Sequence, residues 1–194
     1  MAVIGFSALS AVAQLGGSTE IALTSLAVAA AAAGFLVWNF NPARIFMGDG
    51  GSVPLGFAAA AIGILGWRRG VWPAWLPLLV FSTFAVDATT TLLRRVVAGE
   101  RYWEAHRTHY YQRVIQLGAG HRRTALGAYA LMLATALSAL AFRDGPPLAV
   151  ALLLAAWIGA FTVLALRIDR AWQESRDPMP ASASAAPPDS REGL

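Results

Sequence analysis

The sequence predicts an all-α fold, a polytopic transmembrane bundle of five helices, or six if a weaker apolar run is counted. Hydrophobic residues make up 57% of the 194 residues and charged residues only 13%, and the mean hydropathy is +0.53. A soluble domain of this length needs more charge to cover its surface, so a bilayer is the expected solvent. Apolar runs also recur along the chain with lengths close to the ~17–25 residues that cross a membrane.

Each expected helix corresponds to one apolar run. The five stronger runs are residues 21–38, 53–67, 74–93, 124–142 and 147–166. The second run is short, but Arg68 and Arg69 at its end can snorkel to the interface and let the helix extend.

The weaker run, Ala2–Leu15, precedes Gly16 and Gly17. It lacks the positively charged start of a signal peptide, although Ala11-Val12-Ala13 is a passable cleavage pattern. We therefore favour a further membrane helix here. The predicted membrane domain covers residues 1–176, and residues 177–194, rich in Pro, Ser and Ala, are expected to be a disordered cytoplasmic tail.

The charge pattern argues against nucleic acid as a partner. The formal net charge is +4, but the basic residues, all of them Arg, flank apolar spans instead of forming a basic stripe with interleaved aromatics. Anionic lipid or an anionic substrate is the expected partner. The chain has no cysteine, which excludes disulfides, thiolate metal sites and a cysteine nucleophile.

The distribution of Arg residues among the loops also predicts how the chain is oriented in the membrane. The loop 94–123 holds seven of the fifteen Arg residues, whereas the turns 67–73 and 143–147 hold two and one. An excess of Arg marks cytoplasmic segments, so loop 94–123 and the tail are expected on the cytoplasmic side of the membrane. Alternation of the spans then puts loop 39–52 on the same side.

Loop 39–52 carries the first candidate site, in the stretch NFNPARIFMGDGGSVPLGF. Pro42 and the glycines argue against a continuous helix, and Asn39 and Asn41 suit a helix end. Glycines beside Asp49 leave room for a metal or a phosphate-bound magnesium to approach its carboxylate. By spacing alone, a solvated interfacial turn is an equally good interpretation.

The second candidate site is HRTHYYQR, residues 106–113. On a helix, His106 and His109 share one face, and Arg113 follows one turn later. Imidazole and guanidinium groups together suit a diphosphate or proton handling near neutral pH. The alternative is a basic helix beside the membrane with Tyr110 and Tyr111 as interfacial anchors.

The third candidate is Asp87, which begins a polar stripe with Thr90, Thr91 and Arg94 on an otherwise apolar helix. An acid within a span usually faces the bundle interior and is a functional candidate. The alternative is a structural ion pair between Asp87 and Arg94.

Together these motifs resemble a family. N-x-N-P-A-R-I-F-M-G-D-x-G-S-x-x-L-G at 39–56, D-x-x-x-T-x-L-R-R at 87–95 and H-R-x-H-x-Y-Q-R at 106–113 are similar to the polyprenyl-phosphate N-acetylhexosamine-1-phosphate transferases. These bacterial membrane enzymes include undecaprenyl-phosphate GlcNAc-1-phosphate transferase and phospho-N-acetylmuramoyl-pentapeptide translocase. The resemblance covers about residues 20–170, the C-terminal half of such an enzyme.

The resemblance implies transfer of a sugar-1-phosphate from a UDP-N-acetylhexosamine to a polyprenyl phosphate in cell-envelope polysaccharide synthesis, with Mg²⁺ bridging the pyrophosphate. Asp49 matches the metal-ligand Asp, and His106 and His109 match the cytoplasmic His motif. Three further residues match as substrate-binding candidates: Asn39, Arg107 and Arg113, with Asp87 a weaker one. The H-R-x-H form resembles the lipopolysaccharide (O-antigen) subgroup.

The sequence departs from the family in lacking its two upstream acidic motifs, an adjacent Asp-Asp pair and N-x-x-D-G-x-D-G. We therefore expect a truncated enzyme, a mis-assigned start or half of a split pair, inactive or nearly so as this chain alone. A missing N-terminal half or a second copy is the expected protein partner. The alternatives are a non-catalytic membrane subunit that binds a nucleotide-sugar or lipid phosphate and, ranked last, a small transport bundle.

Overall fold

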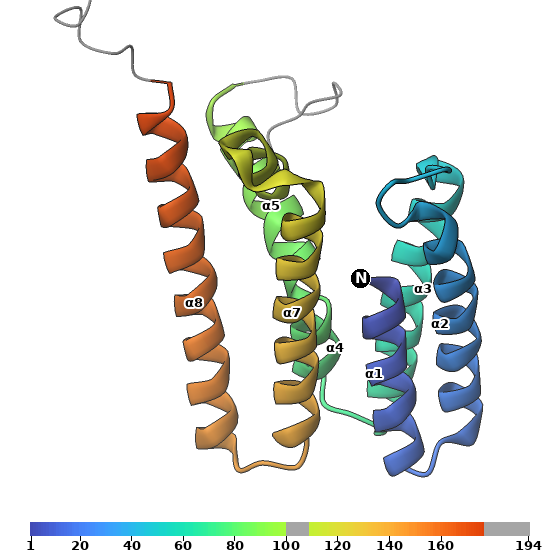
Figure 1. Cartoon of the computed structure of the whole chain (residues 1–194). Coiled ribbons are helices and arrows are strands. Elements are labelled where there is room, and N and C mark those ends of the chain that lie inside the picture. Colours follow the sequence, from blue (N-terminus) through green and yellow to red (C-terminus); the bar gives the residue numbers. More distant parts are fainter. Residues whose placement is uncertain (100–108, 177–194) are drawn as a thin grey trace, which may run out of the picture.

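The chain is described by a computed structural model that covers residues 1–99 and 109–176. Within these ranges every regular element is a helix (Figure 1). The elements in order are α1 (Ala2–Leu15), α2 (Thr19–Asn39), α3 (Gly48–Arg68), α4 (Trp75–Val80), α5 (Ser82–Val97), α6 (Tyr110–Val114), the π-helical turn η1 (Ile115–Ala119), α7 (Gly120–Ala141) and α8 (Pro147–Glu174). The predicted all-α membrane bundle is confirmed.

Within residues 1–99 and 109–176, four helical segments are long and apolar enough to cross a bilayer: α2, α3, the segment Tyr110–Ala141 that contains α7, and α8. The weaker run forms α1, which is apolar but only 14 residues long. The run 74–93, expected as one span, is divided into α4 and α5. The helix breaks at Phe81, where the Ser82 hydroxyl donates a hydrogen bond of 2.7 Å to the Leu79 carbonyl. A side chain that bonds the backbone in this way often bends a helix.

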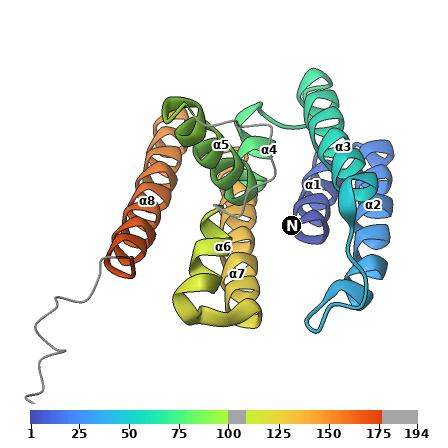
Figure 2. The ribbon, with the colours of Figure 1, turned by 90° about the horizontal axis from the view of Figure 1, so that it is seen from above.

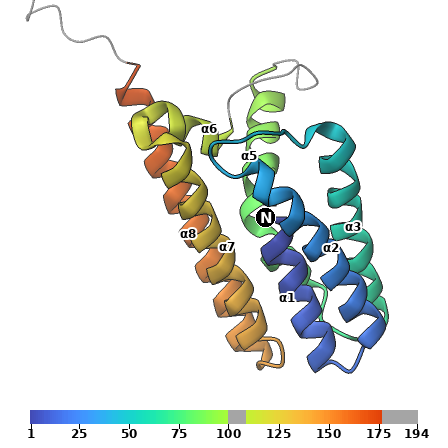
Figure 3. The same cartoon turned by 45° about the vertical axis from the view of Figure 1, so that its right-hand side comes forward.

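The core lies at the junction of α1 with α2, α3, α4 and α7. It gathers apolar side chains from all five helices: Phe6, Leu9, Val12, Ala13, Ile21, Ala22, Ala29, Ile62, Trp72, Leu76, Leu79, Val80 and Ala139. By contrast, α8 has no fully buried residue, and it flanks the bundle beside α7 (Figures 1 and 3). Large apolar side chains on the outer surface, such as Phe57, Leu148 and Ile158, are exposed as expected for groups that face lipid.

The helices alternate in direction, so their connections gather at two ends of the bundle. The connection 40–47, the end of α5, α6 and the end of α8 lie at one end, and the turns 69–74 and 142–146 lie at the other (Figure 1). The described residues of the three sequence motifs therefore lie near one end of the bundle, which we call the motif end. The exception is the part of the first motif that continues into the span of α3.

Candidate functional site

Asp49 lies at the motif end, in the first turn of α3. Helix α2 ends at Asn39, as predicted, and α3 begins at Gly48, so residues 48–52 form the first turn of a helix and not part of an extended loop. Gly48 has a φ of +57°, a conformation that L side chains rarely adopt. A carboxylate in this position is favoured by the positive end of the helix dipole.

The connection before Asp49 is folded back on the end of α2. The Asn39 side-chain amide donates a hydrogen bond of 2.8 Å to the Ile45 carbonyl, and the backbone N–H of Arg44 donates one of 2.8 Å to the Trp38 carbonyl. The Arg44 guanidinium also lies over the Trp38 ring, 5.7 Å from its centroid. Asn39, predicted to support the substrate, is thus engaged in shaping the connection that leads to Asp49.

The surroundings of Asp49 are open. Its side chain is exposed, and no atom lies within 4 Å of the place where a Cβ at Gly50 would stand. Among the described residues no group of three or more His, Asp or Glu side chains is arranged to hold a metal. Asp49 therefore fits as one ligand of a Mg²⁺ ion whose remaining ligands are phosphate and water oxygens, but the described part of the chain does not form a complete site.

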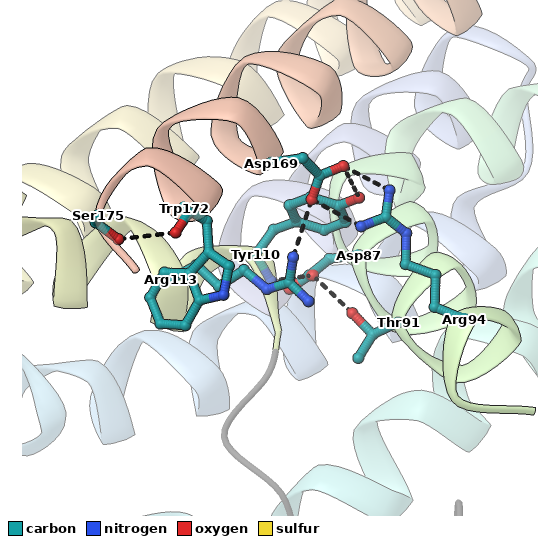
Figure 4. Close-up of polar contacts among 8 residues, drawn as sticks. All are labelled: Asp87, Thr91, Arg94, Tyr110, Arg113, Asp169, Trp172 and Ser175. Carbon is teal, nitrogen blue, oxygen red and sulfur yellow. Dashed lines mark hydrogen bonds and ion pairs between the residues drawn. The ribbon is translucent and has the colours of Figure 1, made fainter. Parts of the chain in front are cut away.

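His109 and Asp87 form a second group at the motif end. The Asp87 carboxylate accepts a hydrogen bond of 2.8 Å from the Tyr110 backbone N–H and a longer one of 3.4 Å from the Thr91 hydroxyl (Figure 4). His109 Nδ1 lies 3.7 Å from the other Asp87 oxygen. Asp87 thus joins α5 to the segment that carries the histidine motif.

The expected helical face of His106 and His109 is corrected by the structure. His109 has extended backbone angles (φ −59°, ψ 148°) and is the N-cap of α6, so the helix begins only at Tyr110. The Gln112 side chain accepts a hydrogen bond from the His109 backbone N–H, which satisfies a donor at this helix start. His106 and Arg107 lie outside the described residues.

Arg94 and Arg113 meet at Asp169, a residue that the sequence analysis did not select. Arg94 donates two hydrogen bonds, of 2.7 and 2.6 Å, to the two Asp169 oxygens, and Arg113 donates one of 2.9 Å (Figure 4). The anticipated structural partner of Arg94 was Asp87, but the observed partner is 75 residues away on α8. The only hint in the sequence was an acid just beyond the apolar run 147–166.

Tyr110 fills the space between these charged groups and is itself buried. Its ring lies 5.2 Å from the Arg94 guanidinium and 5.4 Å from that of Arg113, measured to the ring centroid. Its hydroxyl donates a long hydrogen bond, 3.4 Å, to Asp169. Tyr110 therefore packs as the centre of the cluster, whereas Tyr111 is half exposed, as an interfacial anchor would be.

An apolar groove opens beside this cluster. It has a volume of about 420 Å³ and runs between α5, α7 and α8, with Leu131, Phe161 and Leu164 among its lining residues. Asp87 and Tyr110 lie in its wall as polar groups. A groove with apolar walls and polar groups near the motif end suits an amphiphile with a long chain and a polar head.

The two groups at the motif end belong to different parts of the bundle. Asp49 begins α3, which packs with α1, α2 and α4, whereas His109 precedes α6, which packs with α5, α7 and α8. Figure 2, seen from this end, shows the two groups of helices side by side. The site therefore consists of an exposed carboxylate on one group and a histidine–arginine cluster on the other.

This arrangement defines a multi-pass helical membrane protein with polar chemistry at one end. Comparison with known proteins then shows which proteins the chain is similar to. Residues 1–67 match the model of "Glycosyl transferase family 4". The chain is 31% identical over 146 residues to a "Probable undecaprenyl-phosphate N-acetylglucosaminyl 1-phosphate transferase" of Bacillus subtilis (strain 168), an alignment that covers 74% of this chain and 41% of the relative.

Two further relatives are phospho-N-acetylmuramoyl-pentapeptide-transferases. That of Listeria monocytogenes serotype 4b (strain CLIP80459) is 34% identical over 115 residues, covering 57% of this chain and 34% of the relative. That of Shouchella clausii (strain KSM-K16) is 32% identical over 115 residues, covering 58% and 34%. No solved structure matches the chain.

The resemblance to the polyprenyl-phosphate N-acetylhexosamine-1-phosphate transferases is therefore confirmed. The chain spans about two fifths or less of the length of these curated relatives. Its relatives are transferases by name, and their length leaves more than half of each protein without a counterpart in this sequence.

Proposed function

We propose that this chain takes part in the transfer of a sugar-1-phosphate from a UDP-N-acetylhexosamine to a polyprenyl phosphate at the cytoplasmic face of the inner membrane. The observation that carries the proposal is that Asp49, Asp87, His109 and Arg113, which belong to three separate family motifs, all lie at the motif end of the bundle. A reaction between a soluble nucleotide-sugar and a membrane lipid needs both substrates at one interface.

Each group has a part in this proposal. Asp49 provides one ligand for Mg²⁺, which when bound neutralises the pyrophosphate. His109 and Arg113 face the diphosphate with donors that stabilise charge on its oxygens. The groove between α5, α7 and α8 accommodates part of the lipid chain. The resemblance of H-R-x-H to the O-antigen subgroup suggests a lipopolysaccharide pathway, with an N-acetylhexosamine as the sugar.

A second function, binding without turnover, is favoured by one observation. In the described part of the chain, Asp49 has no cluster of further ligands around it, and the sequence contains neither upstream acidic motif. One carboxylate positions a phosphate-bound magnesium but leaves the acceptor phosphate without the acidic groups that the family uses. We therefore propose that the chain alone binds nucleotide-sugar and transfers little or none of it.

The proposal predicts magnesium-dependent binding of UDP-N-acetylglucosamine to the purified chain in detergent. Equilibrium dialysis with radiolabelled ligand measures it. Asp49→Asn and His109→Ala should each weaken binding about tenfold or more, since each removes a charged or polar contact to the diphosphate. Asp144→Asn is the matched control, because Asp144 is an exposed acid at the opposite end of the bundle.

The same preparation, supplied with undecaprenyl phosphate, tests for transfer through release of UMP. Robust transfer by this chain alone, abolished by Asp49→Asn, would contradict the proposal of an incomplete catalytic set. Absence of any magnesium-dependent binding by the unsubstituted chain would contradict the proposed function as a whole.

A further inference from the structure

Tyr110 is held from two sides by carboxylates of two different helices. Its backbone N–H donates to Asp87 of α5, at 2.8 Å, and its hydroxyl donates to Asp169 of α8, at 3.4 Å (Figure 4). Because His109 directly precedes Tyr110, both attachments restrain the position of the imidazole. Asp87, which makes the attachment to α5, belongs to the motif at 87–95. Asp169, which makes the attachment to α8, lies outside all three motifs.

Asp169 is the junction of this cluster. It binds two guanidinium groups at once, Arg94 through both of its oxygens and Arg113 through one. Its side chain is only 15% exposed and that of Arg113 only 17%. The Arg94 side chain is 43% exposed, but its pair with Asp169 is bidentate, and the single bond from Arg113 is largely shielded from water. Both pairs therefore hold a defined geometry more strongly than solvated surface pairs.

The apolar core does not extend to the polar end of α8. No residue of α8 is fully buried, and the residues with which it packs on the core, such as Leu153 and Trp157, lie in its first half. Beyond the apolar run, α8 packs with α6 and is joined to other elements by polar contacts. These include the Asp169 pairs with Arg94 and Arg113, the hydrogen bond from the Tyr110 hydroxyl to Asp169, and the Arg113 guanidinium over the Trp172 ring, 5.8 Å from its centroid. The cluster is therefore the attachment between the end of α8 and the segment that carries His109.

We propose that Asp169 is a positioning residue that fixes His109 and Arg113 for the anionic ligand by joining α5, α6 and α8. The identity of the ligand in this inference rests on the proposed function. The attachment between the helices does not depend on it. Without the carboxylate, α8 loses its ion pairs to α5 and α6, so the end of α8 and the segment at His109 separate. The Arg94 and Arg113 guanidinium groups on either side of Tyr110 then also repel each other.

The direction in which Asp169→Asn changes the affinity for the ligand distinguishes a positioning role from an effect of net charge alone. Asp87 and Asp169 together balance Arg94 and Arg113, so Asp169→Asn adds one positive charge to the cluster. If Asp169 only tuned the charge, Asn would strengthen the binding of an anionic diphosphate. If Asp169 positions the cluster, Asn weakens it despite the added charge.

The attachment is tested directly by a distance measurement between two spin labels. Because the chain has no native cysteine, Ala98→Cys at the end of α5 and Ser175→Cys at the end of α8 can be labelled cleanly. Both positions are exposed. Double electron–electron resonance on the detergent-purified chain should give a narrow distance distribution for the parent and a broader, longer one for Asp169→Asn.

Asp169→Glu keeps the charge with one more methylene group and should restore most of the parent distribution, and Asp144→Asn should leave it unchanged. A parent-like distribution in Asp169→Asn would overturn the inference. Equal broadening in Asp169→Glu and Asp169→Asn would also overturn it, since loss of the ion pairs would then not be the cause.

The functional part uses radiolabelled UDP-N-acetylglucosamine as the probe. Asp169→Asn should weaken its binding about ten- to a hundredfold, the range expected for losing charge-assisted pairs, and Asp169→Glu should recover part of it. Unchanged or tighter binding in Asp169→Asn would overturn the positioning role. If the parent chain does not bind the probe while the spin-label distances respond as expected, the proposed function fails and the attachment stands.

Discussion

Gly66 of α3 lies against the buried indole ring of Trp72. The Trp72 Nε1–H donates a hydrogen bond of 2.9 Å to the Gly63 carbonyl, and only 3% of Trp72 is exposed. A Cβ placed at Gly66 would overlap three atoms of the indole ring. The glycine at position 66 is thus required by the packing of a large side chain whose polar atom is already bonded.

The first prediction concerns this glycine. Gly66→Ala should destabilise the protein by about 1–3 kcal/mol, because the indole must move and its hydrogen bond to Gly63 is disturbed. Gly56→Ala, on the same helix, is the matched control, since no atom lies within 4 Å of a Cβ there. Thermal unfolding in detergent, followed by circular dichroism at 222 nm, should show a lower midpoint for Gly66→Ala only. Equal midpoints would contradict the packing argument.

At the residue scale, the sequence predicted where polar side chains gather better than it predicted which partners they have. Asp87 and Arg94 stood out as a polar stripe on an otherwise apolar helix, and Arg113 as a member of the histidine motif 106–113. The pairing of both arginines with Asp169 could not be predicted, because it depends on how α8 approaches α5 and α6. The extended backbone at His109 was hidden for a similar reason, since residue spacing alone does not show where a helix begins.

Helices α1 and α2 form an antiparallel pair joined by a tight turn, with a seam of small side chains on α2. The buried residues of α2 that follow Ile21 are Ala22, Ser25, Ala29 and Ala32, spaced by three or four positions as one helix face requires. The Ser10 hydroxyl of α1 donates a hydrogen bond of 2.8 Å to the Ala22 carbonyl. Small residues allow such close backbone approach between membrane helices.

The small residues of this seam lead to a prediction for the α1–α2 pair. Ala29→Leu should destabilise the pair by about 1–3 kcal/mol, because Ala29 is 3% exposed and lies in the core cluster with Phe6 and Leu9. Ala27→Leu places the same side chain on an exposed position of the same helix and should have little effect. Urea or detergent-denaturation midpoints measure the difference; a similar loss in both variants would show that the seam is not closely packed.

Element prediction from apolar runs succeeded where the run is uninterrupted and failed where local backbone bonding intervenes. α2 begins and ends close to the run 21–38, and α8 begins with the run 147–166 but continues beyond it to Glu174. The run 74–93 is apolar on both sides of Phe81, so hydropathy gave no sign of the break there. The glycines around Asp49 suggested a loop, but Gly48 only starts the helix, and the remaining glycines continue it.

For the whole molecule, the asymmetry of charge matches the alternation of the helices. Arg-rich segments are at the motif end, and the turns with fewer arginines are at the other (Figure 1). α8 is about 42 Å long at ~1.5 Å per residue, longer than a hydrocarbon core of ~30 Å. Its last turns, with Asp169 and Trp172, can therefore extend beyond the hydrocarbon at the motif end.

This orientation predicts the labelling of single cysteines, which the absence of native cysteine makes unambiguous. Ala43→Cys and Ala98→Cys, at the motif end, should react with a membrane-impermeant maleimide only in inverted vesicles or after permeabilisation. Asp144→Cys, whose position is exposed at the opposite end, should react in intact spheroplasts. The reason is that arginine-rich ends remain cytoplasmic during insertion. If Ala43→Cys and Ala98→Cys reacted from opposite sides, Asp49 and His109 could not act on one diphosphate, and the proposed site would be untenable.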